Sequence, residues 1–201
     1  MVEIIKYGNF EPIGFNKKKT QIILCHTSRD VEEYLTSLKF RYFGKYTRIP
    51  HYVITKTGKT LQLLPDESFS SIFSDELTNK NGIIIYLENL GWLEKKPLSN
   101  EYISWNGGIY NGKPYEKKWR DYFFWDNYTE PQLTKLTQLC LELCNNFNIE
   151  KKFIGINTKQ EGIKHFDGIV CRSNFNTRFT DLNPSFDFVN FLNNIENEST
   201  L

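Results

Sequence analysis

Two short apolar runs constrain the fold of this 201-residue chain more than any other feature. Residues 21–25 read Q-I-I-L-C, and residues 82–87 read G-I-I-I-Y-L, the most apolar run in the sequence. Short runs that are rich in β-branched residues and lack alternating polar positions are typical of strands buried on both faces of a sheet. The sequence therefore predicts two interior strands and further elements that cover them.

Helical patterns separate the predicted strands. Ser28 can cap a helix that extends to about residue 40, and Ser185 can cap a last helix near the C-terminus. The clearest helix begins at Thr129, where Gln132 completes a capping box, and its apolar residues recur at helical spacing as far as residue 147. These segments predict helices that cover the sheet.

Shorter signals complete the predicted architecture. The segment T-K-T-G-K over residues 55–59 joins two short strands and predicts a hairpin in which Gly58 takes a positive φ. Residues 153–156 predict one more short strand. Strands that alternate with helices are typical of the α/β class, here a central mixed β-sheet flanked by helices. We expect a single domain over residues 1–201.

Residues 91–128 interrupt this alternation and form a predicted insertion. They contain all four tryptophans, show no helical periodicity and are divided into turns by glycine and proline. Two interpretations stay open: the aromatic side chains form a small satellite core under a long loop, or they form a platform that binds sugar rings or another partner. The candidate binding residues of the second interpretation are Trp92, Trp105, Trp119, Trp125 and Tyr110.

Composition excludes several classes of protein. The chain has 25 basic and 24 acidic residues, so it lacks the charge of a general nucleic-acid binder. No apolar run reaches the roughly 18 residues of a membrane-spanning helix, and no signal peptide is visible, which predicts synthesis in the cytoplasm. Cys140 and Cys144 lie one helical turn apart on an apolar face, so we expect buried thiols and a reducing compartment.

Six motifs, taken in order along the chain, resemble the amidase-2 family of N-acetylmuramoyl-L-alanine amidases and peptidoglycan recognition proteins. The resemblance covers roughly residues 20–192 and implies that family's fold, with a zinc cleft on one face of a mixed sheet. The zinc would polarise an amide carbonyl and activate water. The six motifs are I-I-L-C-H-T-S, P-H-Y-V-I-T-K-T-G-K-T-L-Q-L-L-P-D, I-I-I-Y-L-E-N, Y-T-E-P-Q-L, F-I-G-I-N and T-D-L-N-P-S-F.

The resemblance implies three zinc ligands, and this chain matches only part of the set. His26 matches the first ligand, although a shift of one residue would put Cys25 there, and Asp181 matches the third. The family's second histidine corresponds to Ile156, which has no lone pair. Asn157 beside it is a poor ligand, because zinc prefers nitrogen and sulfur donors.

The loop over residues 157–179 carries two replacement candidates for the missing ligand, His165 and Cys171. The groups that assist catalysis also differ. Tyr86 stands where relatives of the recycling type have glutamate, and Glu88 lies two residues further along the same predicted strand face. Tyr86 and Glu88 are therefore the candidate catalytic residues. Phe179 replaces a lysine, and Phe73 replaces another of the family's polar residues. We expect the remaining histidine, His51, to have a structural role.

These losses favour a degenerate amidase, with no cofactor, that serves as a peptidoglycan-binding module or as a structural protein of a phage virion or tail. Peptidoglycan or neighbouring virion proteins are then the expected partners, without nucleic acid and without membrane insertion. Two alternatives stay open. The first is an active zinc amidase that uses His26, Asp181 and a ligand from the loop, and the second is a protein-interaction module that uses the aromatic insertion.

Overall fold

The computed structural model describes residues 2–197 and contains a six-stranded sheet in the order β1-β5-β4-β7-β3-β13. Strands β4, β7, β3 and β13 run parallel to one another, whereas β5 is antiparallel to β4. The predicted mixed sheet is therefore confirmed. The strands of this sheet are β1 (Ile4–Lys6), β3 (Gln21–His26), β4 (Tyr52–Ile54), β5 (Thr60–Gln62), β7 (Gly82–Leu87) and β13 (Gly168–Cys171).

The two strands expected at the centre of the sheet, β3 and β7, are neighbours. They pair in parallel from Gln21 opposite Gly82 to His26 opposite Leu87. Every residue of both strands is buried, which explains why neither carries an alternating polar pattern. The β4–β5 hairpin also forms as predicted, with Gly58 at a φ of +83°.

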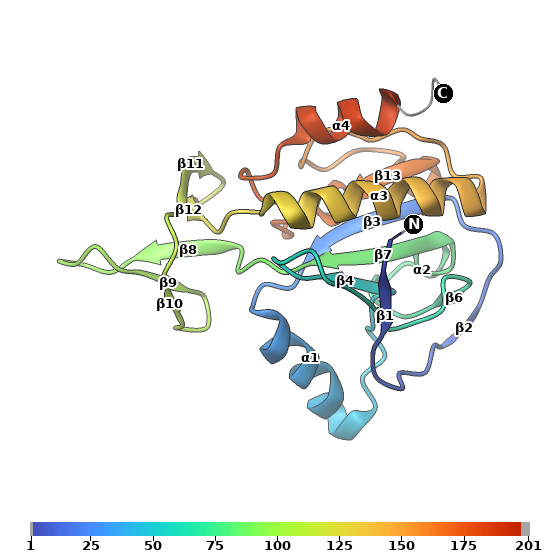
Figure 1. The fold of residues 1–201 in the computed structure, drawn as a ribbon, viewed down its shortest axis with the longest axis horizontal. Helices are drawn as coiled ribbons and strands as arrows, with labels where there is room; N and C mark the ends of the chain where they lie inside the picture. The colour runs from blue at the N-terminus through green and yellow to red at the C-terminus, as the bar shows by residue number, and fades with distance from the viewer. Residues whose placement is uncertain (1, 198–201) are drawn as a thin grey trace.

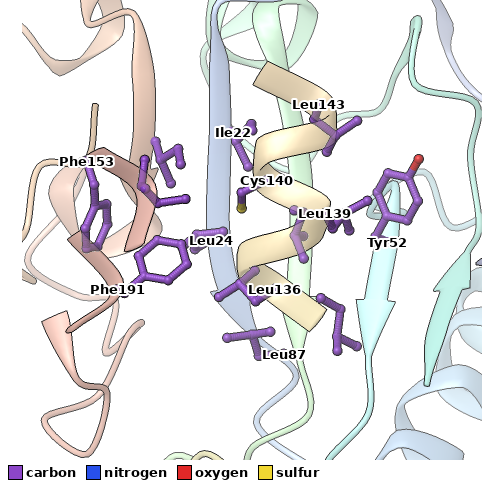
Figure 2. Packing of buried hydrophobic residues seen from close by; sticks show 14 of the residues in the cluster. Ile22, Leu24, Tyr52, Leu87, Leu136, Leu139, Cys140, Leu143, Phe153 and Phe191 are labelled. Carbon is purple, nitrogen blue, oxygen red and sulfur yellow. The ribbon is translucent and has the colours of Figure 1, made fainter. Parts of the chain in front are cut away.

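Helices cover both faces of the sheet (Figure 1). The helices α3 (Glu130–Phe147) and α4 (Phe188–Asn197) pack on one face, and α1 (Val31–Phe40) packs on the other, while the short α2 (Glu76–Asn81) precedes β7. Figure 2 shows Ile22 of β3 beside Cys140 of α3 and Leu87 of β7 beside Leu136 of α3, while Leu24 lies beside Phe191 of α4. Alternate residues of β3 point the other way, so Cys25 packs with Leu38 of α1.

All four cysteines are buried and free, as predicted for the pair on α3. None of the helices within residues 2–197 has the length and apolar character needed to cross a lipid bilayer.

The predicted helix caps are wrong in detail. Asp30, two residues after Ser28, caps α1 by accepting a hydrogen bond of 2.8 Å from the Glu33 amide. The capping box at the start of α3 does not form. Instead the Gln132 amide donates to the carbonyl oxygens of Ile54 and Glu88 at 2.9 and 3.0 Å. The Gln132 side chain thus forms tertiary hydrogen bonds in place of the capping contact that the local sequence pattern predicts.

The start of the last helix also differs from the prediction. The Ser185 hydroxyl donates a hydrogen bond to the Asp126 carbonyl, at 2.8 Å, and does not cap α4. The Asp187 carboxylate accepts from the Asn190 amide near the helix start instead. Residues 153–156 contribute only an isolated bridge between Phe153 and Ile169, and no strand.

The aromatic insertion forms a second sheet that the sequence analysis did not foresee. Its five strands are antiparallel in the order β10-β9-β8-β12-β11, and they extend away from the end of β7 (Figure 1). The Asp126 amide donates to the Gly91 carbonyl at 2.9 Å, which closes the insertion at its base. The strands are β8 (Trp92–Lys95), β9 (Tyr102–Ser104), β10 (Ile109–Tyr110), β11 (Tyr115–Trp119) and β12 (Tyr122–Trp125).

His51 joins two strands inside the molecule and is completely buried. Its Nδ1 accepts from the Ile84 amide of β7 at 3.0 Å, and its Nε2 lies 2.9 Å from the Ser68 carbonyl of β6 (Ser68–Phe69). Burial, followed by the nearby charge of Lys19, lowers the pKa of His51 from 6.5 to about 3. The ring is therefore neutral, and this environment fits the structural role expected from the sequence.

Stability is expected to fall as pH drops from 6.5 toward 3, because the unfolded chain protonates His51 while the folded protein does not. This residue alone contributes a loss of about 1.4 kcal/mol for each pH unit in that window. Urea unfolding of the wild type and of His51→Gln between pH 7 and pH 4 measures the difference. Equal pH slopes for the two proteins would show that His51 is not the titrating group.

Candidate functional site

The candidate site lies where three strands of the main sheet end. His26 is the last residue of β3, Tyr86 is the second-to-last residue of β7, and Arg172 follows β13 directly. Because these strands are parallel neighbours, their carboxyl ends meet at one edge, where binding sites of open α/β sheets usually lie. Asp181 reaches this edge from the segment after the 3₁₀ turn η3 (Arg172–Asn174).

A two-pronged ion pair occupies the centre of the site. Arg172 Nε donates to Asp181 Oδ2 at 2.8 Å, and Arg172 Nη2 donates to Oδ1 at 3.0 Å. The His26 backbone amide also donates to Oδ1, at 2.7 Å. Asp181 is fully buried; burial alone would raise the pKa of its carboxyl, but the charge of Arg172 holds that pKa below its usual value. The carboxylate is therefore ionised, and the positive charge of Arg172 balances its negative charge.

Aromatic side chains hold the Arg172 guanidinium in place. The Arg172 Cζ atom lies 4.5 Å from the centre of the Phe179 ring, and Arg172 Nη1 donates to the Tyr86 hydroxyl at 3.2 Å. Burial would lower the pKa of Arg172, but the Asp181 charge raises it well above its ordinary value. Tyr86 and Phe179, which stand where the family resemblance implies polar groups, thus enclose the Arg172 guanidinium.

His26 borders the same ion pair. Its Nε2 lies 3.5 Å from Asp181 Oδ1, and its side chain is 2% exposed. Burial lowers the pKa of His26, and the effect exceeds the opposing effect of the Asp181 charge, so the imidazole is neutral. Its Nδ1 is buried without a hydrogen-bond partner among the described residues. The structure brings His26 and Asp181 together, as the sequence analysis expected.

The other candidate ligands lie in different surroundings. Cys25 packs on the α1 side of the sheet, where burial raises the pKa of its thiol well above the ordinary value. The Asn157 amide donates to the Leu182 carbonyl at 2.9 Å. His165 belongs to η2 (Ile163–His165), which contacts Gln21 at the start of β3, about 16 Å from His26 for a strand of this length. His165 is therefore too distant to serve as the third ligand.

Ile156, which the resemblance puts at the second ligand, lies outside the sheet and is 45% exposed. The strand beside β3 is β13, which ends at Cys171. Burial raises the pKa of the Cys171 thiol to about 12, so the sulfur keeps its proton. Within residues 2–197 no group of three His, Cys, Asp or Glu side chains is arranged to hold a metal ion.

The residues present do not fit a catalytic zinc ion. Such a site needs three protein ligands and an open position for water. Here both oxygens of Asp181 accept hydrogen bonds from Arg172, and among residues 2–197 no third His, Cys, Asp or Glu side chain completes a set of metal ligands. The guanidinium supplies the positive charge that a metal would otherwise supply. The sequence did not predict a role for Arg172, although this residue lies in the same 157–179 loop as His165 and Cys171.

The two proposed catalytic side chains have structural partners. The Glu88 carboxylate accepts from the amides of Val31 and Lys56 at 3.1 and 2.8 Å, which joins α1 to the loop after β4. Burial raises the pKa of the Tyr86 phenol, so its hydroxyl stays protonated beside Arg172. The Glu88 carboxylate thus holds backbone amides, and Tyr86 is buried.

The aromatic residues of the insertion divide into two groups. Trp125 is fully buried, so it cannot contact a ligand, and its Nε1 donates to the Lys117 carbonyl at 2.8 Å. Trp105 is 45% exposed; its indole donates to the Ser28 carbonyl, and Arg29 lies over its ring. Trp92 and Trp105 line a cavity of about 400 Å³ that also reaches His26 and Arg172.

The arrangement of Trp119 and Tyr110 leaves each partly covered. Arg120 lies over the Trp119 ring at 4.3 Å, and Trp119 packs against Trp125 with ring centres 5.3 Å apart. Tyr110 is half-buried on β10. Trp119 therefore packs inside the insertion. A role of Trp119 and Tyr110 in ligand binding stays a prediction.

The fold agrees with comparisons to known proteins. The family model for N-acetylmuramoyl-L-alanine amidase, Amidase_2, matches residues 16–174. This match covers more than half of the chain, so the chain belongs to the amidase-2 family. No curated protein sequence matches it. The matched span includes His26 and Arg172 but ends before Asp181, so the equivalence of Asp181 with a family ligand stays a prediction.

Solved structures with the same fold include two amidases of Clostridium intestinale. The amidase LysC has a TM-score of 0.57 at 13% identity, with 100% of this chain and 99% of that chain covered. The endolysin amidase LysCS has a TM-score of 0.57 at 14% identity, with 100% and 97% covered. The Pseudomonas aeruginosa protein AmpDh3, solved in complex with an anhydromuramic pentapeptide, has a TM-score of 0.53 at 14% identity, with 94% and 63% covered.

Proposed function

We propose that this protein binds peptidoglycan through its amidase fold and does not hydrolyse it. The observation that carries the proposal is the ion pair between Arg172 and Asp181, which occupies the place where the family resemblance puts a metal ion. A guanidinium has no coordination position for a water molecule, so it cannot lower the pKa of a bound water as zinc does. Family membership supports peptidoglycan as the ligand.

Displacement of Arg172 by zinc would be costly. The guanidinium would lose two charge-assisted hydrogen bonds to Asp181, its bond to Tyr86 and its contact with Phe179. In exchange the metal would gain His26, Asp181 and a thiol that must first lose its proton. The contacts that Arg172 would lose outweigh those that zinc would gain, which favours the ion pair over the metal.

Purified sacculi test both parts of this proposal. The wild-type protein is expected to co-sediment with sacculi and to release no stem peptides, even after addition of zinc. An active amidase of the family is the positive control for peptide release. Zinc-dependent release that Asp181→Ala abolishes would contradict the proposal and would favour an active zinc amidase that uses His26, Asp181 and Cys171. Absence of co-sedimentation would contradict peptidoglycan binding.

A phage setting, in which the protein contacts the cell wall or a neighbouring virion protein, is part of the same proposal. The likeness in fold to the endolysin amidase of Clostridium intestinale supports it. The alternative of a protein-interaction module rests on exposed apolar side chains of the insertion, Ile109 and Phe123, which are 56% and 50% exposed. That alternative predicts a complex with a protein partner that Phe123→Ala weakens, and no binding to sacculi.

A further inference from the structure

Two adjoining cavities near the ion pair are lined by cationic side chains. The first, of about 400 Å³, is lined in part by Arg29, Arg41, Arg48 and Arg172. The second, of about 670 Å³, shares Arg41 and Arg48 with the first and adds Lys45. No aspartate or glutamate is among the described residues that line either cavity. We call this surface the basic track.

The charge of the basic track is only partly compensated. Asp181 neutralises Arg172, and Glu33 lies 3.3 Å from Arg29. Arg41 donates to the Tyr46 hydroxyl, which carries no charge. Within residues 2–197, Arg41, Lys45 and Arg48 form no ion pair. Because the whole chain has a net charge of only +1, this is a local concentration of charge, and such a surface attracts anions.

The aromatic walls of the track restrict which anion it suits. Tyr34 and Tyr86 stack on each other with ring centres 5.4 Å apart, and Trp92 stacks on Tyr122 at 4.5 Å. Arg29 covers the Trp105 ring. Each of these contacts occupies one face of a ring, which leaves fewer free faces on which the bases of a single-stranded nucleic acid could stack. Guanidinium groups and hydroxyls remain to bind the ligand.

From the cavities, the uncompensated charge and the partly covered rings, we infer that the basic track binds an anionic cell-wall polymer, whose charges are carboxylates or phosphodiesters. This inference rests on the proposed function and specifies its ligand. Arg41 and Arg48 donate charge-assisted hydrogen bonds to successive anionic groups, and Arg172 closes the inner end of the track. The binding therefore weakens as salt concentration rises.

Calorimetry with three probes tests the inference on the whole chain: a disaccharide–peptide fragment with free carboxylates, the same fragment with amidated carboxylates, and a glycerol-phosphate oligomer. The variant Arg41→Gln/Arg48→Gln is compared with Lys17→Gln/Lys18→Gln, which removes the same charge from exposed residues before the start of β3. We expect at least one anionic probe to bind the wild type, and its affinity to fall about tenfold or more only in the arginine variant. The amidated fragment binds weakly to every protein.

The two anionic probes distinguish the sources of charge, and several results would overturn the inference. These are equal affinity for the amidated and charged fragments, no binding of either anionic probe, equal loss in the lysine variant, and an oligonucleotide that binds as tightly. If the arginine variant binds sacculi and both anionic probes like the wild type, the inference fails while the proposed function stands. If the glycerol-phosphate oligomer binds but purified sacculi do not, the inference stands and peptidoglycan binding fails.

Discussion

Replacement of Arg172 by alanine is expected to destabilise the fold by about 3–5 kcal/mol, because the buried Asp181 carboxylate loses its counter-charge. Protonation of Asp181 could relieve the unpaired charge, but at pH 7 this would itself cost about 4 kcal/mol. That cost shrinks as pH falls, so the difference between the two proteins should decrease toward pH 4. Urea unfolding at pH 7 and at pH 4 measures both effects.

Three further variants separate the ion pair from a general loss of side-chain packing. Arg178→Ala removes an exposed arginine six residues away, and it should change stability by less than about 0.5 kcal/mol. Arg172→Lys keeps the positive charge but cannot donate two parallel hydrogen bonds to Asp181, so its stability should lie between that of the wild type and that of Arg172→Ala. In Arg172→Ala/Asp181→Asn the second change removes the unpaired charge, so part of the stability should return. A small effect of Arg172→Ala at both pH values would show that Asp181 does not depend on this arginine.

Replacement of Trp125 by alanine is expected to cost about 3–5 kcal/mol and to disorder the insertion sheet more than the main sheet. Trp125 is fully buried and packs against Trp119 and Tyr122, with ring centres 5.3 and 5.8 Å away. It also pairs with Trp92 across β8 and β12. Its loss therefore leaves a large cavity where the insertion has few other buried side chains. Hydrogen exchange of β8 and β12 amides, compared with those of β3 and β7, measures the effect.

Trp105→Ala is the matched control for that experiment. Trp105 lies in the same insertion but is 45% exposed, and its contacts are with Ser28 and Arg29. Its replacement should change stability by about 1 kcal/mol or less and should leave the exchange of β12 unchanged. Equal exchange in β8 and β12 of the wild type and Trp125→Ala would mean that the insertion sheet does not depend on a buried tryptophan.

The main sheet could be predicted from the sequence because its signals are local. The apolar runs of β3 and β7 specify strands buried on both faces, and the stripe of α3 specifies a helix that packs on them. The strands of the insertion give no such signal: β11 reads Y-E-K-K-W, with four of its five residues exposed. The capping errors have a related cause, since tertiary partners took Gln132 and Ser185 from the helix ends.

The site was predictable only in part. The approach of His26 to Asp181 follows from their motifs and is present in the structure. Residues 153–156 were expected to form a strand, but β13 pairs with β3 instead, and this pairing joins segments far apart in sequence. The role of Arg172 could not be predicted from the resemblance, because arginine is not a metal ligand. An arginine can match a buried carboxylate as well as a metal can, and its position alone gives no sign of this.

Zinc content is the most direct test of the proposal that Arg172 has taken the place of the metal. The protein is equilibrated with excess zinc, free metal is removed, and bound zinc is measured by elemental analysis for the wild type, His26→Ala and Asp181→Ala. We predict no stoichiometric zinc in the wild type and no difference among the three proteins. Stoichiometric zinc in the wild type that is lost in His26→Ala and in Asp181→Ala would contradict the proposal.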